Sequence, residues 1–342
     1  MNDTFSEFVD YLTENMQYIK DSLVMDRGSE SYKHYEKVFL ENFHEYRAVG
    51  DFRGSVSATD STEFVRELYS GKKIVLIRAY TRMGNDVTSK FLAEVLSVGR
   101  DDLSLFIGLL MEHYEHLSTM ESLKTCKQDF ALIDGSLVGR LIHDRGKLSA
   151  SGYENFTELY FSTLEELFHI SAEVEVPLVF VSKSSDSRVF TRYLQTLIGD
   201  SGRFGDETDH LLVRSIAQSH GYTTPIMMPM KIGATGRRIN VVSFHAVPDT
   251  IDLPLKVDIF NGKKQEEIIE SPIPVEVNRE ILSMIFWGYG GIKAHNIWLA
   301  DVDRLVKFKT PEIENLYMKT FEKMTGIHFY ETRGERRARI RI

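Results

Sequence analysis

Four acidic residues stand where a folded chain could hold divalent metal ions. Asp60 follows the extended stretch "FRGSVSAT", and Asp134 follows the apolar run Phe130–Ile133 in "FALIDGSL". Between them, Glu112 and Glu115 lie three residues apart in "LLMEHYEHLS", so a helix would place both on one face. Carboxylates are hard oxygen ligands that suit Mg²⁺ or Mn²⁺. The residue types therefore predict a divalent metal site if the fold brings them together.

His295, near the C-terminus, extends the chemistry that such a site would support. An imidazole nitrogen shifts the preference of an oxygen site from Mg²⁺ towards Mn²⁺. Two ions ~3.5–4 Å apart would activate water for in-line attack on a phosphodiester. They would also stabilise the charge that develops on the phosphate and on the departing oxygen. The predicted chemistry is phosphodiester hydrolysis.

Each of these residues also has an ordinary structural interpretation. An Asp-Gly pair after a strand is a common turn, and Asp-Ser-Thr is a common cap. Two glutamates three residues apart are typical of a solvated helix face. A histidine between Trp287 and Trp298, as His295 is in sequence, is typical of a packed structural residue. Spacing alone leaves these alternatives open.

Hydrophobic periodicity predicts the helices that must position the acids. Apolar residues recur at steps of three or four in residues 4–47, which favours two helices separated at Arg27. The stretch "NREILSMIFWGYGGIKAHNIWLADVDRLVKF" is predicted to be helical on both sides of Gly288–Gly291, with His295 on the second helix. Two further long helices are predicted over residues 101–124 and 153–174.

Apolar segments between the helices predict the strands. Lys73–Arg82 is rich in Ile, Val and Tyr, and we expect it to pair antiparallel with a strand that ends near Asp60. Phe130–Ile133 and Leu178–Val181 are short and wholly apolar, as parallel strands covered on both faces are. "RRINVVSFHAV" and "LPLKVDIF" predict an antiparallel pair. The simplest fold is one mixed α/β domain with a helical N-terminal extension.

Composition narrows the class of protein. The chain has 342 residues, 42% of them hydrophobic, which suffices for one large domain or two smaller ones. A net charge of −9 argues against a protein that coats DNA by electrostatics alone, although an acidic metal site would itself contribute negative charge. The last ten residues, "RGERRARIRI", carry five arginines. We expect them to contact DNA or a partner, with a solvated tail as the alternative.

Cysteine content and hydropathy bear on the cellular setting. The single cysteine, Cys126, excludes an internal disulfide framework and a cysteine-rich zinc site, and it fits a reducing cytoplasm. No apolar run approaches the ~18 residues that span a bilayer. The N-terminal stretch "MNDTFSEFVDYLTENMQYIKDSL" is acidic and amphipathic, unlike a signal peptide.

Four of these segments, taken in order, resemble the NurA nucleases of archaea and bacteria, which have a ribonuclease H-like (Piwi-like) core. "SATDSTEFVRELYSGKKIVLIRA" and "FALIDGSL" are similar to the family's two acidic strand ends, with Asp-Ser-Thr here where the family has Asp-Gly-Ser. "PLVFVSKSSDS" is similar to an apolar strand that ends in a lysine, here Lys183. "GYGGIKAHNIWLADVDRL" is similar to the stretch around an Ala-His pair, here Ala294-His295.

The resemblance implies a set of site residues and a fold. The implied fold is a mixed α/β sheet of ribonuclease H-like type over residues 49–308, after a helical extension over 1–48 and before a C-terminal helix and basic tail over 309–342. Asp258, in "LKVDIF", falls where the family often has an acidic residue. The implied metal ligands are Asp60, Glu115, Asp134 and His295, with Lys183 and Glu112 as further catalytic candidates.

The resemblance also implies an activity and partners. Family members are Mn²⁺-preferring nucleases that degrade single- and double-stranded DNA, with 5′ to 3′ exonuclease action. They work as dimers docked on a hexameric HerA-type ATPase in DNA end resection and repair. Two alternatives stay open: a catalytically inactive subunit of the same fold that binds DNA or the ATPase, and an RNA-directed phosphoesterase. Mg²⁺ is the alternative ion.

Overall fold

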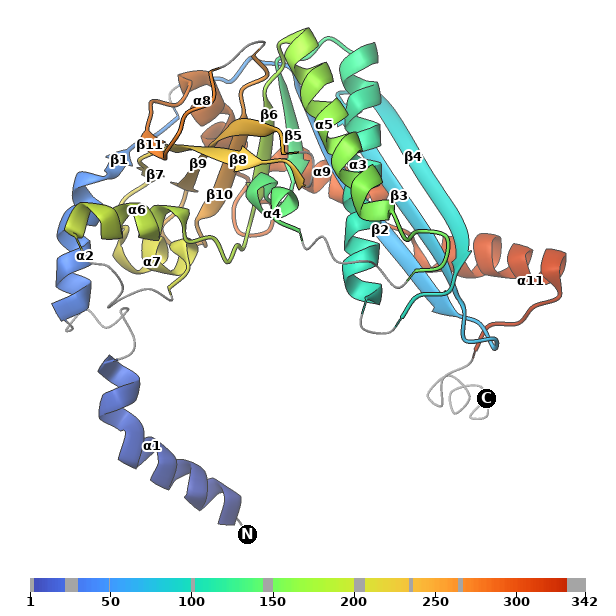
Figure 1. The fold of residues 1–342 in the computed structure, drawn as a ribbon, viewed down its shortest axis with the longest axis horizontal. Helices are drawn as coiled ribbons and strands as arrows, with labels where there is room; N and C mark the ends of the chain where they lie inside the picture. Colours follow the sequence, from blue (N-terminus) through green and yellow to red (C-terminus); the bar gives the residue numbers. More distant parts are fainter. Residues whose placement is uncertain are drawn as a thin grey trace.

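The computed structural model shows a large mixed sheet with helices on both faces (Figure 1). The predicted helix break at Arg27 and the arginine-rich residues 333–342 lie outside the described residues. No helix within the described parts of the chain is long and apolar enough to cross a membrane. The structure describes residues 3–21, 30–48, 50–99, 102–143, 150–199, 207–233, 236–263 and 267–330.

Three antiparallel strands form one end of the sheet: β2 (Val56–Glu67), β3 (Lys73–Met83) and β4 (Asp86–Leu96). The predicted antiparallel pairing of β3 with the Asp60 strand is confirmed. The prediction that this strand ends near Asp60 is wrong, because β2 pairs with β3 as far as Glu67. The polar residues after Asp60 reflect a strand with exposed positions, not the end of a strand.

The centre of the sheet is parallel. β5 (Phe130–Asp134) lies between β2 and β6 (Leu178–Ser182) and runs parallel to both, as the two apolar runs predict. β10 (Leu255–Phe260) pairs antiparallel with β6 and with β9 (Arg238–Val247), which confirms the predicted pair. The path through the sheet is β1-β7-β9-β10-β6-β5-β2-β3-β4. Beyond β9 lie β7 (Gly221–Thr223), β8 (Ile226–Lys231), β1 (Phe43–Glu45) and β11 (Ile273–Pro274).

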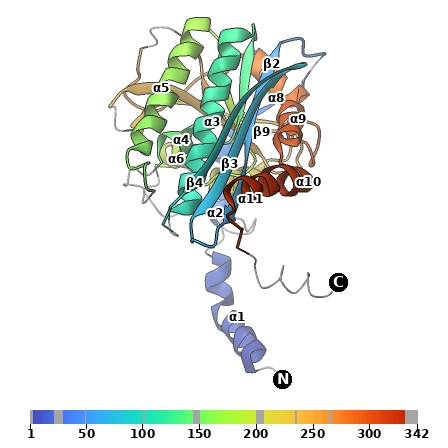
Figure 2. The same ribbon diagram turned by 90° about the vertical axis from the view of Figure 1, so that its right-hand side faces the viewer.

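Helices cover the central strands from both sides, as Figure 2 shows. α3 (Leu103–Thr125) and α5 (Phe156–Val174) pack on one face. α8 (Arg279–Trp287) and α9 (Ile297–Val306) pack on the other. Successive residues of each strand therefore enter different cores: Ala131 and Ile133 of β5 face α3, whereas Phe130 and Leu132 face α8 and α9. Burial on both faces explains why the central strands are apolar throughout.

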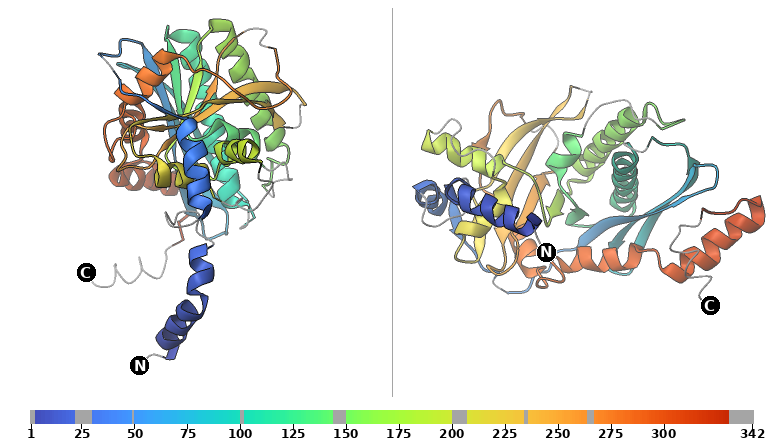
Figure 3. Two further views of the ribbon diagram at one scale, coloured as in Figure 1. Left: turned by 90° about the vertical axis from the view of Figure 1, so that its left-hand side faces the viewer. Right: turned by 90° about the horizontal axis from the view of Figure 1, so that it is seen from below.

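The N-terminal segment is only partly helical. α1 (Asp3–Asp21) lies away from the sheet (Figure 3), and α2 (Glu30–Glu41) packs against α6 (Val189–Ile198) and near α7 (Asp209–Ile216). The predicted helicity to residue 47 is wrong, because β1 follows α2 and pairs with β7. Three short helical segments follow α9: α10 (Thr310–Glu312), a π-helical turn (Ile313–Met318) and α11 (Lys319–Thr325).

Candidate active site

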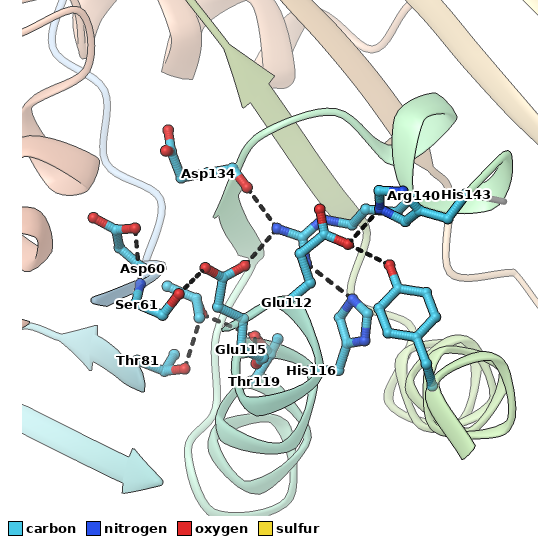
Figure 4. Close-up of polar contacts among 12 residues, drawn as sticks. Asp60, Ser61, Thr81, Glu112, Glu115, His116, Thr119, Asp134, Arg140 and His143 are labelled. Carbon is cyan, nitrogen blue, oxygen red and sulfur yellow. Dashed lines mark hydrogen bonds and ion pairs between the residues drawn. The ribbon is translucent and has the colours of Figure 1, made fainter. Parts of the chain in front are cut away.

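Two aspartates meet where neighbouring strands separate. The parallel pairing of β2 with β5 ends at Thr59 opposite Ile133, so the next residues are Asp60 and Asp134 (Figure 4). β2 continues along β3, while the chain after β5 turns away. The sheet therefore places the two carboxyl-bearing residues beside each other at the point of separation.

The turn after Asp134 has its own requirements. Gly135 has φ +97°, a conformation that favours glycine, and its N–H donates to Val181 O at 3.0 Å. The Ser136 hydroxyl accepts from Gly139 N at 3.1 Å and so caps the short helix α4 (Leu137–Leu141). Asp134 itself is partly exposed, with 40% of its side chain accessible. Asp-Gly-Ser is thus a turn, as its ordinary interpretation predicts, and it also leaves the carboxylate at the strand end.

Hydroxyl groups hold α3 close to the sheet. Thr59 Oγ1 lies 2.8 Å from Thr81 Oγ1 on β3 and 2.9 Å from Thr119 Oγ1 on α3. One turn earlier on α3, Glu115 Oε1 accepts from Ser61 Oγ at 2.5 Å. Because Ser61 directly follows Asp60, this contact brings a third carboxylate towards the two aspartates (Figure 4).

Glu112 and Glu115 have different surroundings although they lie one turn apart. Glu112 Oε2 accepts from Tyr160 Oη at 2.5 Å and lies 2.8 Å from His143 Nε2. Glu115 contacts Ser61 on one side and the Arg140 guanidinium on the other. Figure 4 shows Glu112 on the side of Arg140 away from Asp60, so the geometry favours Glu115 as the residue that joins the aspartates.

Burial and neighbouring charges shift the pKa values of these acidic residues. Burial raises the pKa of Asp60 to about 8, and the nearby charges of Glu115 and Asp134 add to the effect. Burial also raises the pKa of Glu115, although Arg140 and Ser61 oppose that change. At Glu112, burial acts in the same direction, but Arg140 and His143 outweigh it and the pKa falls below its usual range. Asp60 and Glu115 thus form an electrostatically unfavourable pair that a cation would relieve.

His295 lies beside Asp134 but not on a helix, so the prediction of a helical His295 is wrong. The Asn296 Oδ1 atom accepts from Trp298 N at 3.1 Å, and this cap starts α9 after the histidine. His295 is buried, and its Nε2 atom lies 3.8 Å from Asp134 Oδ1 and has no hydrogen-bond partner in the part of the chain that the structure describes. The rings of Trp287 and Trp298 contact each other, with centroids 5.6 Å apart.

Lys183 and Asp258 occupy different positions relative to the aspartates. Lys183 is exposed and follows β6, two residues after the Val181 that pairs with Asp134. Asp258 is fully engaged inside the protein, where its Oδ2 atom accepts from Lys256 Nζ at 2.7 Å and from Ser136 Oγ at 2.8 Å. Burial opposes ionisation of Asp258, but Lys256 outweighs it and lowers the pKa. Asp258 therefore anchors the turn after Asp134 and leaves little room for a metal ion.

Sequence reasoning missed several polar residues around the acids. Ser61 and Arg140 contact Glu115 directly, and Asp303 and Lys307 on and after α9 lie near Asp60. Lys307 Nζ bonds Asp303 Oδ2 at 2.7 Å, which raises the pKa of Lys307, and Asp60 contributes to the rise. Single polar residues of this kind carry no periodic signal. Only the position of Arg140 on the helix after Asp-Gly-Ser could have drawn attention to it.

The donor set fits a divalent cation. Among the described residues, no three His, Cys, Asp or Glu side chains converge closely enough to be a complete metal site. The groups that approach one another are nonetheless the right ones. Burial, with the nearby charges of Glu115 and Asp134, raises the pKa of Asp60, and a buried imidazole nitrogen has no hydrogen-bond partner among the described residues. Hard oxygens with one imidazole suit Mn²⁺ or Mg²⁺.

Comparisons with known proteins identify the family to which the chain belongs. The NurA domain profile matches residues 54–308. The NurA nuclease of Sulfolobus solfataricus is 17% identical, with a TM-score of 0.60 over 95% of this chain and 98% of that one. A structure of NurA with manganese is 11% identical, with a TM-score of 0.60 over 91% and 98% of the two chains.

A structure of NurA bound to dAMP and manganese is 10% identical, with a TM-score of 0.56 over 94% of this chain and 98% of that one. No curated protein sequence matches the chain. The predicted mixed α/β sheet flanked by helices is confirmed, and the fold is shared with the solved NurA structures. The chain therefore belongs to the NurA family of nucleases.

Proposed function

We propose that this nuclease hydrolyses DNA with divalent metal ions, preferably Mn²⁺, bound between β2, β5 and α3. The observation that carries the proposal is the approach of Asp60, Glu115 and Asp134 at the separation of β2 and β5. The solved NurA structures with manganese support the choice of ion. A dAMP-bound NurA structure supports a deoxynucleotide substrate.

Each residue has a distinct role in this proposal. Asp60, Asp134 and Glu115 would hold the metal through oxygen, and His295 would do so through its unpartnered Nε2. Bound there, a divalent ion would supply an activated water and charge stabilisation at the phosphorus. Lys183 is the candidate for a positive charge near the phosphate, since its exposed side chain follows the strand next to β5. Glu112 would remain outside the reacting groups.

The mode of DNA cleavage, the oligomeric state and the partner that we propose follow the family resemblance. We propose 5′ to 3′ exonuclease and single-strand endonuclease action on DNA ends, as a cytoplasmic homodimer working with a HerA-type hexameric ATPase in end resection and repair. The single cysteine, Cys126, fits a reducing compartment. The arginine-rich residues 333–342 are the candidate contact with DNA or the ATPase.

A cleavage assay with matched substrates tests the proposal. End-labelled single-stranded DNA, double-stranded DNA and RNA of one sequence are incubated with the protein in Mn²⁺, Mg²⁺ or EDTA. We expect DNA cleavage in Mn²⁺, slower cleavage in Mg²⁺ and none in EDTA, because the carboxylates alone cannot activate water. Labels at either end report the direction of digestion.

Three results would contradict the proposal, each in a different way. Cleavage that continues in EDTA would show that the reaction does not need a divalent metal ion. Cleavage of RNA in preference to DNA would favour the RNA-directed phosphoesterase. DNA binding without cleavage in any metal, with or without a HerA-type ATPase, would favour the inactive subunit.

A further inference from the structure

Arg140 is a buried arginine that contacts two of the proposed ligand residues. It belongs to α4, and only 3% of its side chain is accessible. Arginine is seldom buried to this degree unless its guanidinium group is paired. The partners of this group therefore indicate what it does.

One nitrogen of Arg140 links α3 to the strand end of β5. Nη2 donates to the Glu115 carboxylate, and it also donates to Asp134 O at 2.7 Å (Figure 4). A Cβ atom at Gly135 would lie 3.5 Å from this Nη2, an ordinary van der Waals contact, so the turn passes close to the guanidinium. The backbone of the Asp134-Gly135 turn and the Glu115 carboxylate thus both bind one atom, Nη2 of Arg140.

Further contacts fix the plane of the guanidinium. Nη1 lies 2.9 Å from His116 Nε2, which must accept because arginine has only donors. The guanidinium carbon lies 5.3 Å from the centre of the Phe180 ring. A planar, rigid fork held in this way controls direction as well as distance. It leaves Glu115 Oε1 bonded to Ser61, the residue that follows Asp60.

The charge of Arg140 does not cancel the negative charge of the site. Glu112 and Glu115 both interact with it electrostatically, so these three groups together carry a net charge of −1 when ionised. Asp134 adds to that negative charge, as does Asp60 once it has lost its proton. A cation is therefore still attracted to the site with Arg140 in place.

We propose that Arg140 is a positioning residue that fixes the Glu115 carboxylate relative to Asp134, so that both can bind one metal ion. The inference rests on the proposed function, because it assumes that these two residues are ligands. Groups that orient metal ligands typically contribute 10- to 100-fold to metal affinity. A purely structural ion pair would instead contribute to stability without acting through Glu115.

A double-mutant cycle on Mn²⁺ binding separates these two roles. Binding is measured from the loss of the electron paramagnetic resonance signal of free Mn²⁺, for the wild-type protein, Arg140→Lys, Glu115→Gln and the double variant. We expect Arg140→Lys to raise the Mn²⁺ dissociation constant 10- to 100-fold, because a lysine cannot hold both acceptors in one plane. In the Glu115→Gln background the same change should have little further effect.

Cleavage provides a second readout of positioning. Arg140→Lys retains Glu115, so high Mn²⁺ should restore most of its rate. Glu115→Gln lacks a ligand and should not recover. Arg78→Lys is the matched control, since Arg78 is also buried and bonds Glu312 and the carbonyl of Val306 away from Glu115. It should lower stability and leave Mn²⁺ affinity unchanged.

A second variant covers the case in which Arg140→Lys fails to fold. Arg140→Gln combined with Glu112→Gln removes one charge of each sign and so preserves the net buried charge. It should show the same loss of Mn²⁺ affinity. Unchanged affinity in the folded variant, or a loss that adds in full to that of Glu115→Gln, would overturn the positioning role. A wild-type protein that binds no Mn²⁺ would contradict the proposed function itself, and the inference with it.

Discussion

Replacing Glu115 by glutamine should reduce Mn²⁺-dependent DNA cleavage by at least ~10²-fold, while Glu112→Gln should reduce it by less than ~10-fold. Both changes keep the shape of the side chain and remove one negative charge. Only Glu115 faces Ser61 and the aspartates, whereas Glu112 is bound to Tyr160 and His143. Initial rates on labelled DNA at saturating Mn²⁺ measure the difference.

The two variants serve as controls for each other. They lie on the same helix, both lose a carboxylate near Arg140, and both can be checked for folding by circular dichroism and melting temperature. If Glu112→Gln is the inactive protein and Glu115→Gln cleaves normally, the metal ligand on α3 is Glu112, one turn before Glu115. Equal activity of both variants would show that α3 supplies no metal ligand.

Replacing Asp60 or Asp134 by asparagine should also lower cleavage by at least ~10²-fold, the usual scale for a lost electrostatic contact at a reaction centre. The two changes should differ in their effect on stability. Asp134 is partly exposed, so its replacement should leave the melting temperature nearly unchanged. Asp60 is 9% exposed and has a pKa raised to about 8, so its charge is costly in the folded, metal-free protein.

The sign of the stability effect follows from the raised pKa of Asp60. The folded protein keeps the proton up to about pH 8, whereas the unfolded chain loses it near the ordinary aspartate pKa of 3.8. The stability that protonated Asp60 contributes is therefore complete below pH 3.8 and is lost as pH rises through about 8. In EDTA at pH 8, Asp60→Asn should therefore be more stable than wild type, because asparagine carries no charge that burial would penalise.

Mn²⁺ should reverse this order of stability. Binding at 100 times the dissociation constant stabilises the wild-type protein by about 2.7 kcal/mol, and Asp60→Asn should lose most of that gain. Thermal melts in EDTA and in Mn²⁺, at pH 6 and pH 8, measure both effects. Near-normal cleavage by folded Asp134→Asn, or a melting order for Asp60→Asn that does not change with Mn²⁺, would exclude that aspartate as a ligand.

Periodicity predicted the elements that carry the site because their burial is regular. α3 is apolar along the face that packs on the sheet, and β5 and β6 are apolar throughout because both of their faces are covered. These patterns locate the strand end at Asp134 and the helix that carries Glu115. The end of the strand through Asp60 could not be predicted, because β2 continues with polar, partly exposed positions that resemble a loop.

The side-chain network around Glu115 could not be predicted from periodicity. Ser61 stands where the resembled family has glycine, and its hydroxyl bonds Glu115. Arg140 reaches Glu115 only because α4 folds back after Gly135. His295 precedes α9 because Asn296 caps that helix. Each contact depends on tertiary geometry that joins residues far apart in the chain.

The location of bound Mn²⁺ in a crystal tests directly whether Asp60, Glu115 and Asp134 build the metal centre. An anomalous difference map, recorded near the manganese absorption edge from a Mn²⁺-soaked crystal, locates the ion without reference to activity. We expect the strongest peak between the Asp60 and Asp134 carboxylates, within bonding distance of both. A strongest peak at Glu112 and His143, or no peak near Asp60 and Asp134 at saturating Mn²⁺, would contradict it.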